Sequence, residues 1–383
     1  MPRLATVTQI APLIFCRLRD LAGDSVPSGL FEYLRALSAR NYHLARNLVD
    51  LTSLLEARHI PVLAYKGPAA AMAIYGDLAL RQYEDLDLVI HQEHLSRTLD
   101  LTAQRGFRIV PYSSRCGFHF VPHDIRPDNP KHIAKYHVVT LRAPDNTFFV
   151  DLHWQLANDD ARAFSPAIEK VWDRAERLEL PHGSVSTFCR EDLLLALCYH
   201  GTKHRWSCLK WLLDIAELLC KAETLDWSLI QEMTADTSLA GASTALALLL
   251  AGELLGVMVA PEARKALPVT QSTICVASTI REEILMAGHA DRNNHATLLQ
   301  LEGRFLAWMK YLCFRYPGWW LDGVFGQVSP NDRSLITLPE KLQFLYHFIR
   351  PARLVVKHSR RAFSTLWSII FIVANKFFVP RRA

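Results

Sequence analysis

Asp85 and Asp87 are the residues of this chain best suited to chemistry by type and spacing. They lie in residues 83–90, which read YEDLDLVI. If residues 85–90 form a strand, both carboxylates project from one face while Leu86 and Leu88 enter the core. Carboxylates held so close repel one another unless a divalent cation or a shared proton neutralises them. The pair predicts a metal site, with a polar strand edge as the alternative.

A third acid follows in a later predicted strand, residues 147–154, which ends in VDLHW. Alternation places Asp151 and His153 on one face of this strand and Val150, Leu152 and Trp154 on the other. Asp151 brings the number of strand acids to three, which is enough to hold two magnesium ions.

A phosphate-binding turn is predicted at Lys66-Gly67, between a short buried strand at 60–65 and a helix at 69–75. Pro68 suits the first position of that helix. A helix N-terminus with a glycine allows close approach of phosphate to the backbone, and Lys66 adds a full positive charge. The dipeptide alone is weak evidence, but the downstream acids strengthen it.

The elements that must position these residues fall into four predicted segments. They are an N-terminal helical segment at 1–58, a core at 59–183, a helical domain at 184–350 and a basic, apolar tail at 351–383. Apolar periodicity predicts helices at 30–59, 95–105, 190–222, 227–236, 240–255, 261–267, 273–287 and 297–314. Residues 107–152 are predicted to be rich in strands.

Composition indicates a folded protein, because half of its 383 residues are hydrophobic. Its eight cysteines are scattered without a Cys-x-x-Cys pair, which favours reduced, mostly buried thiols and a cytoplasmic location. No secretory signal is expected at the N-terminus.

Charge is unevenly distributed. The net charge is +5, but residues 350–383 hold eight basic residues and no acid, so the rest carries −3. A slightly acidic body argues against general affinity for nucleic acid. The apolar run at 366–374 is too short to span a bilayer. Two readings of the tail stay open: peripheral contact with an anionic membrane, or docking on the helical domain or another subunit.

Taken together, these motifs resemble the uncharacterised nucleotidyltransferase family of the polymerase-β-like superfamily. The resemblance runs from about residue 30 to 353 and is carried by AYKGPAAA at 64–71, IYGD at 74–77, RQYEDLDLV at 81–89, VDLHW at 150–154, HGTKHRW at 200–206 and WLLD at 211–214. It implies an α+β fold: a polymerase-β-like core, built as a small mixed sheet with helices, between an N-terminal helical segment and a C-terminal helical domain.

The resemblance implies roles for the acids. Asp85 and Asp87 would bridge Mg²⁺ (or Mn²⁺) and the phosphates of a nucleoside triphosphate (NTP) such as ATP. Asp151 would join a second metal and help deprotonate the acceptor hydroxyl. His153 is expected to hydrogen-bond Asp151 as a supporting residue, in preference to binding metal itself.

The resemblance also implies roles for three residues near the nucleotide. Lys66 and Gly67 would hold the β- and γ-phosphates, and Arg81 would neutralise the leaving pyrophosphate. The wider superfamily usually has Gly-Ser or Gly-Gly at this turn, but the family shares the Lys-Gly substitution. A surface ion pair with Asp77 or Glu84 is the alternative for Arg81.

His200, Lys203 and His204 share one face of a predicted helix. A zinc site is disfavoured because Gly201 stands where the metalloprotease motif requires Glu. Two readings stay equal: these side chains contact phosphate or acceptor, or they cap and pair within the helical bundle. Asp214, further along, is expected to be structural.

The sequence therefore predicts a Mg²⁺-dependent nucleotidyltransferase that acts on an NTP and an acceptor hydroxyl or phosphate, in natural-product or surface-polymer biosynthesis. A small molecule, peptide or glycan is favoured over nucleic acid as the acceptor. The alternatives are a non-catalytic nucleotide-binding or scaffold protein, and a toxin-like enzyme that modifies RNA or protein.

Overall fold

The computed structural model describes residues 9–22, 28–110, 137–156, 168–221, 225–235, 238–267 and 269–287. The chain divides into two compact units, residues 1–303 and 304–383, and every described residue belongs to the first. The predicted helix at 297–314 and the tail at 351–383 lie outside the described residues.

A mixed sheet of seven strands forms the centre of the described part, in the order β3-β4-β5-β2-β1-β7-β6. β2 runs parallel to β5, and β1 runs parallel to β7. The other neighbours are antiparallel. The strands are β1 (Val62–Ala64), β2 (Asp85–Ile90), β3 (Arg108–Val110), β4 (Val138–Arg142), β5 (Phe149–His153), β6 (Glu176–Leu180) and β7 (Gly183–Thr187).

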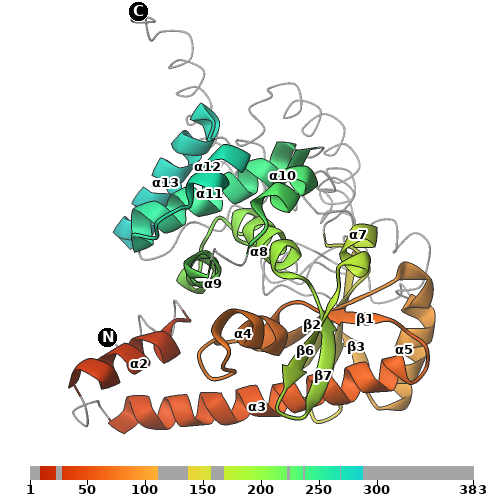
Figure 1. Cartoon of the computed structure of the whole chain (residues 1–383). Helices are drawn as coiled ribbons and strands as arrows, with labels where there is room; N and C mark the ends of the chain where they lie inside the picture. The colour runs from red at the N-terminus through yellow and green to blue at the C-terminus, as the bar shows by residue number, and fades with distance from the viewer. Residues whose placement is uncertain are drawn as a thin grey trace, which may run out of the picture. The chain divides into compact units, whose positions relative to one another are not determined.

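Helices lie before, between and after these strands (Figure 1). The first part of the chain contributes α2 (Ala11–Ala22), α3 (Ser28–Glu56), α4 (Gly67–Tyr75), the short 3-10 helix η2 (Gln92–His94), α5 (Leu95–Gln104) and α7 (Ile168–Asp173). The helical half follows the sheet and comprises α8 (Arg190–Lys203), α9 (Leu209–Cys220), α10 (Trp227–Ala235), α11 (Ser238–Leu255), α12 (Pro261–Ala266) and α13 (Gln271–Ala287).

The alternation of side chains gives the sheet two separate cores. Leu86 and Leu88 point into the core that α3 and α5 cover. Leu63 and Val89 point the other way and join the core of the helical half, with α8, α9 and α11. The expected α+β class, a mixed sheet flanked by helices, is confirmed. The odd-numbered positions of β2, which include both acids, face the helical half.

The predicted helix at 190–222 is wrong as a single helix, because it breaks between α8 and α9. Arg205 and Trp206 adopt φ of +57° and +53°, which ends the helix. The Trp206 indole is almost fully buried and lies against Gly201, and this contact holds the turn in place. Apolar periodicity continued across the break, so the sequence pattern did not reveal it.

The β6–β7 hairpin was not predicted. β7 joins the sheet beside β1, so the expected boundary between 183 and 184 falls inside a strand of the sheet. The division into domains otherwise stays a prediction.

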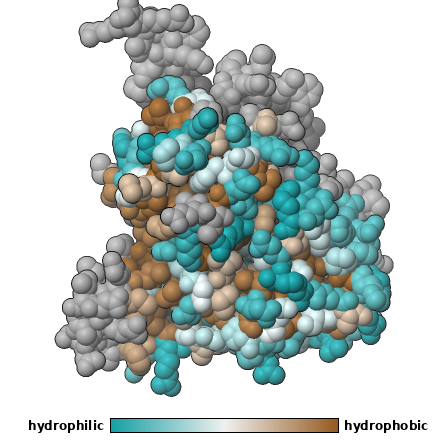
Figure 2. All heavy atoms as spheres, viewed as in Figure 1, coloured by the Kyte–Doolittle hydropathy of each residue, from teal (hydrophilic) through white to brown (hydrophobic). Residues whose placement is uncertain are grey.

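No helix among the described residues is long and apolar enough to cross a membrane. Figure 2 shows hydrophobic side chains gathered along the side of the helical half where α9 and α13 lie, and Ile274 and Leu285 of α13 are exposed. The six described cysteines are free thiols. Cys220 and Cys275 are exposed, so fewer of these thiols are buried than the sequence led us to expect.

We predict that Gly201→Ala destabilises the protein by about 1–3 kcal/mol. An added Cβ would meet Trp206 ring atoms at 2.5–2.6 Å, and this buried ring has no room to move. Urea unfolding measures the effect. Gly29→Ala in α3 is the control, because nothing lies within 4 Å of its added Cβ. Equal stability of the two variants would contradict the packing argument.

Candidate active site

Parallel pairing of β2 with β5 brings the predicted acids together. Asp87 lies in register with Asp151, and Asp85 pairs with Phe149 at the start of both strands. His153 follows Asp151 by two residues and so shares its face. Paired residues 64 positions apart thus form one cluster on the sheet face that carries the helical half.

Asp87 is the centre of the contacts in this cluster. Lys66 Nζ lies 3.2 Å from Asp87 Oδ1, and His153 Nε2 lies 3.3 Å from the same oxygen. The expected partner of His153 was therefore wrong: it is Asp87 and not Asp151. Asp151 instead accepts a hydrogen bond from the Thr140 hydroxyl, 2.6 Å from its Oδ1.

Burial and repulsion dominate the electrostatics of the acids. Burial, Asp87 and Asp85 together raise the pKa of Asp151 from 3.8 to about 7. Burial and Asp87 also raise the pKa of Asp85. Burial opposes ionisation of Asp87 as well, but Lys66 and His153 hold its pKa below its usual value. Asp87 is thus stably ionised, whereas ionisation of Asp85 and of Asp151 is disfavoured by burial and by the charge already present on Asp87.

Lys66 is the N-cap of α4, with an extended backbone and no side-chain capping bond. Its side chain is free for the acids. Burial opposes its charge, but Asp87 raises the Lys66 pKa above its ordinary value. The ammonium therefore stays charged and partly neutralises the cluster.

Gly67 brings the N-terminus of α4 against the acidic strand. Its φ is +56°, and an added Cβ would lie 2.8 Å from the Asp85 carbonyl oxygen. The close approach that requires glycine is thus to the protein's own backbone. The N-terminus of α4 thus begins beside Asp85; Pro68 there has no N–H, and the Ala70 N–H donates to the Lys66 carbonyl at 3.4 Å.

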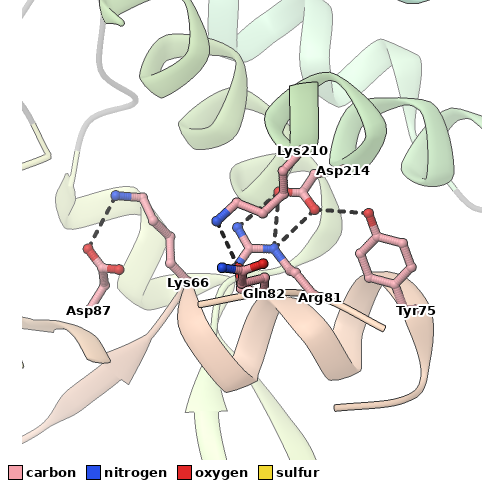
Figure 3. A network of polar contacts seen from close by, with 7 residues as sticks. All are labelled: Lys66, Tyr75, Arg81, Gln82, Asp87, Lys210 and Asp214. Carbon is pink, nitrogen blue, oxygen red and sulfur yellow. Dashed lines mark hydrogen bonds and ion pairs between the residues drawn. The ribbon is translucent and has the colours of Figure 1, made fainter. Parts of the chain in front are cut away.

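Arg81 has a different place from either expectation. Arg81 is 4% exposed. Its guanidinium forms a bidentate ion pair with Asp214 of α9, in which Nε donates to Oδ1 at 3.0 Å and Nη2 donates to Oδ2 at 2.9 Å (Figure 3). The Tyr75 hydroxyl donates to the same carboxylate at 3.0 Å. The surface pair with Asp77 or Glu84 is wrong. The expected contact of Arg81 with pyrophosphate is not supported either, because Asp214 already neutralises the charge of the Arg81 guanidinium.

His200 and His204 pack with Trp211 of α9. Their ring centroids are 4.7 Å apart, and each lies within 5.4 Å of the Trp211 ring. Burial and the nearby Lys66 charge lower the pKa of His200 well below its usual value. These contacts support the bundle reading for the two histidines. Burial lowers the pKa of His153, and the Lys203 charge adds to this effect.

Sequence reasoning missed Lys210 and Thr140. Lys210 Nζ donates to the Gln82 carbonyl at 2.8 Å, and burial and Arg81 lower the Lys210 pKa to about 8. Lys210 and Asp214 are four residues apart, and this spacing could have indicated that both side chains lie on one face of the same helix. Nothing in the sequence indicated the contact of Thr140 with Asp151, because only the pairing of β4 with β5 brings the two residues together.

The donor set fits a hard divalent cation. Ligand atoms of Asp87, Asp151 and His153 all lie within 4.8 Å of one another, and this is the metal-suited group among the described residues. Carboxylate oxygens are ligands that Mg²⁺ and Mn²⁺ accept. Asp85 lies on the same face but outside this group, so its role as a ligand stays a prediction.

The mixed sheet, the acids on adjacent strands and the Lys66-Gly67 turn define a protein of the nucleotidyltransferase class. Residues 2–256 match the family described as "Uncharacterised nucleotidyltransferase", and the chain belongs to that family. The family expected from the sequence motifs is confirmed.

Solved structures give weaker similarities. The solution structure of the antibiotic-resistance factor ANT(2'')-Ia is 13% identical, with a TM-score of 0.34, covering 52% of this chain and 91% of that one. The crystal structure of an antigenic nucleotidyltransferase-like protein from Paracoccidioides brasiliensis is 21% identical, with a TM-score of 0.31, covering 47% and 77%. No curated protein matches the sequence significantly.

We predict that Asp151→Asn stabilises the metal-free protein at pH 8 by up to about 4 kcal/mol, at about 1.4 kcal/mol for each unit by which the Asp151 pKa is raised. Because the pKa of Asp151 is raised from 3.8 to about 7 in the folded state, the wild type loses stability as pH rises through this interval. The variant lacks this loss, so its advantage shrinks toward pH 4. Urea unfolding with EDTA across this range measures it.

Asp50→Asn, on the exposed surface of α3, is the control and should change little at any pH. An Asp151→Asn advantage that does not vary with pH would contradict the assigned electrostatics.

We also predict that Arg81→Met costs about 3–5 kcal/mol of unfolding free energy, because it leaves Asp214 buried without its cation. Arg46→Met is the matched control: its pair with Asp50 is exposed, and its loss should cost less than about 1 kcal/mol. Denaturant unfolding compares the two. Equal small losses would show that the Arg81–Asp214 pair is not the structural tie described above.

Proposed function

We propose that this protein transfers a nucleoside monophosphate from an NTP to a hydroxyl or phosphate of an acceptor, releasing pyrophosphate. The observation that carries the proposal is the alignment of Asp87 with Asp151 on parallel strands, beside the Lys66-Gly67 turn. Acids placed to hold a divalent cation beside a helix N-terminus and a lysine are what a metal–triphosphate substrate requires.

In this proposal Asp85, Asp87 and Asp151 hold the metal, with His153 as a further donor. Mg²⁺, when bound, would neutralise the phosphates and make the α-phosphorus more electrophilic. Lys66 and the positive N-terminal end of α4 would bind the phosphate tail. Lys66 contacts Asp87 in the ligand-free protein, so it already lies where a cation is needed.

Asp151 is suited to accept the acceptor's proton. Thr140 occupies its Oδ1, which leaves Oδ2 to take the proton. The acceptor oxygen then bonds to the α-phosphorus as the bond to pyrophosphate breaks. In the metal-free protein the pKa of Asp151 is raised to about 7, and a bound cation would lower it and keep the carboxylate ionised, as a general base requires.

The acceptor we propose is a small molecule, peptide or glycan in a biosynthetic pathway for natural products or surface polymers. The support is charge: residues 1–349 carry a net charge of −3, which gives little general attraction for a nucleic acid. Cytoplasmic location and peripheral membrane contact through residues 351–383 stay predictions.

Labelled NTPs test the function. Each α-³²P-labelled NTP is incubated with the protein, Mg²⁺ and a cell extract, and we expect one of them to label an acceptor. Asp85→Asn/Asp87→Asn should reduce transfer by at least about a hundredfold, since removing metal ligands removes the charge stabilisation of the reaction. EDTA should have the same effect.

Asp50→Asn serves as the control, because this acid is exposed on α3 and lies outside the site. Equal transfer by wild type and the double variant would reject the assigned site. Tight NTP binding without transfer to any acceptor would instead favour the non-catalytic binding protein.

A further inference from the structure

Lys66, Arg81 and Lys210 are three buried or nearly buried cations near Asp87 and Asp214, and two of them have carboxylate partners (Figure 3). Lys66 contacts Asp87, and Arg81 contacts Asp214. Lys210 differs, because its ammonium donates to a neutral group, the Gln82 carbonyl at 2.8 Å. No carboxylate among the described residues lies within ion-pair distance of Lys210 Nζ.

This burial is unfavourable in the ligand-free protein. Lys210 is 9% exposed, and a buried ammonium that contacts no carboxylate of the described residues directly recovers little of the hydration it loses. Burial and the Arg81 charge lower the Lys210 pKa to about 8, which reflects that deficit. A structural contact with one carbonyl does not require a charged donor. Lys210 is therefore a buried cation whose direct partner among the described residues is a neutral carbonyl.

The surroundings of Lys210 place its ammonium at the nucleotide end of the site. Lys210 lies in the first turn of α9, and its partner Gln82 precedes Asp85 by three residues. The Lys210 charge acts to lower the pKa of Asp85, and the Asp85 charge acts to raise the pKa of Lys210. The Arg81–Asp214 pair fixes α9 against this segment, so the ammonium has a defined position.

We propose that Lys210 binds the pyrophosphate portion of the NTP, as a cation contributed by the helical half. This rests on the proposed function and assigns one group to its phosphate subsite. Lys66 and the N-terminal end of α4 would approach the phosphates from the sheet, and Lys210 would approach them from α9. The helical half would thus take part directly in substrate binding.

Calorimetric titration with magnesium pyrophosphate tests the proposal. Lys210→Met should weaken pyrophosphate and NTP binding by about tenfold or more, the effect of losing one charge-assisted hydrogen bond. Affinity for the corresponding NMP should be unchanged, since it lacks the pyrophosphate portion. Lys210→Arg should retain most of the affinity, because it keeps the charge. Thermal unfolding of ligand-free Lys210→Met should show stability equal to or above that of wild type.

Lys221→Met is the matched control. Lys221 follows the other end of α9 and likewise donates to a backbone carbonyl, that of Ile74 at 2.6 Å, away from the acids. Its variant should bind pyrophosphate as wild type does.

Unchanged pyrophosphate affinity in Lys210→Met would overturn this inference and leave the proposed function standing. Loss of stability together with equal loss of NMP and pyrophosphate affinity would also overturn it, in favour of a structural tie. A wild type that binds neither pyrophosphate nor any NTP would overturn the proposed function itself.

Discussion

Repulsion among three carboxylates on one buried sheet face is the constraint around which the site is organised. Asp85, Asp87 and Asp151 lie on adjacent strands beneath the helical half, where water cannot screen them fully. Lys66 partly neutralises them from the N-terminus of α4. Burial first, and then the charges of Asp87 and Asp85, raise the pKa of Asp151 despite the Lys66 charge. A site with residual negative charge is one that favours a divalent cation.

The two halves of the described structure meet through buried polar contacts as well as apolar packing. Asp214 of α9 accepts hydrogen bonds from Arg81 and Tyr75, which come from the segment between α4 and β2 and from α4 itself. The same segment leads into Asp85. Packing of α9 and the position of the acidic strand are therefore linked, and a change at either would be felt by the other.

Local sequence patterns predicted a helix or strand well where all the residues that define it lie within that one element. Strand alternation located β2 at residues 85–90, and Pro68 and Gly76 marked the limits of α4. The break between α8 and α9 was missed because it depends on Trp206 packing against Gly201, a contact that periodicity does not encode. Arg81 was misread because its partner, Asp214, is 133 residues away.

The sequence by itself determined which residues can do chemistry and which face of each strand they occupy, because residue type and a period of two are local properties. Tertiary structure alone decided their partners. Pairing of β2 with β5 aligned Asp87 with Asp151, directed His153 to Asp87 and brought Thr140 to Asp151. Docking of α9 paired Arg81 with Asp214 and placed Lys210 on the Gln82 carbonyl, with no carboxylate of the described residues within ion-pair distance. Partner choice depends on strand register and helix packing, which distant parts of the chain set together.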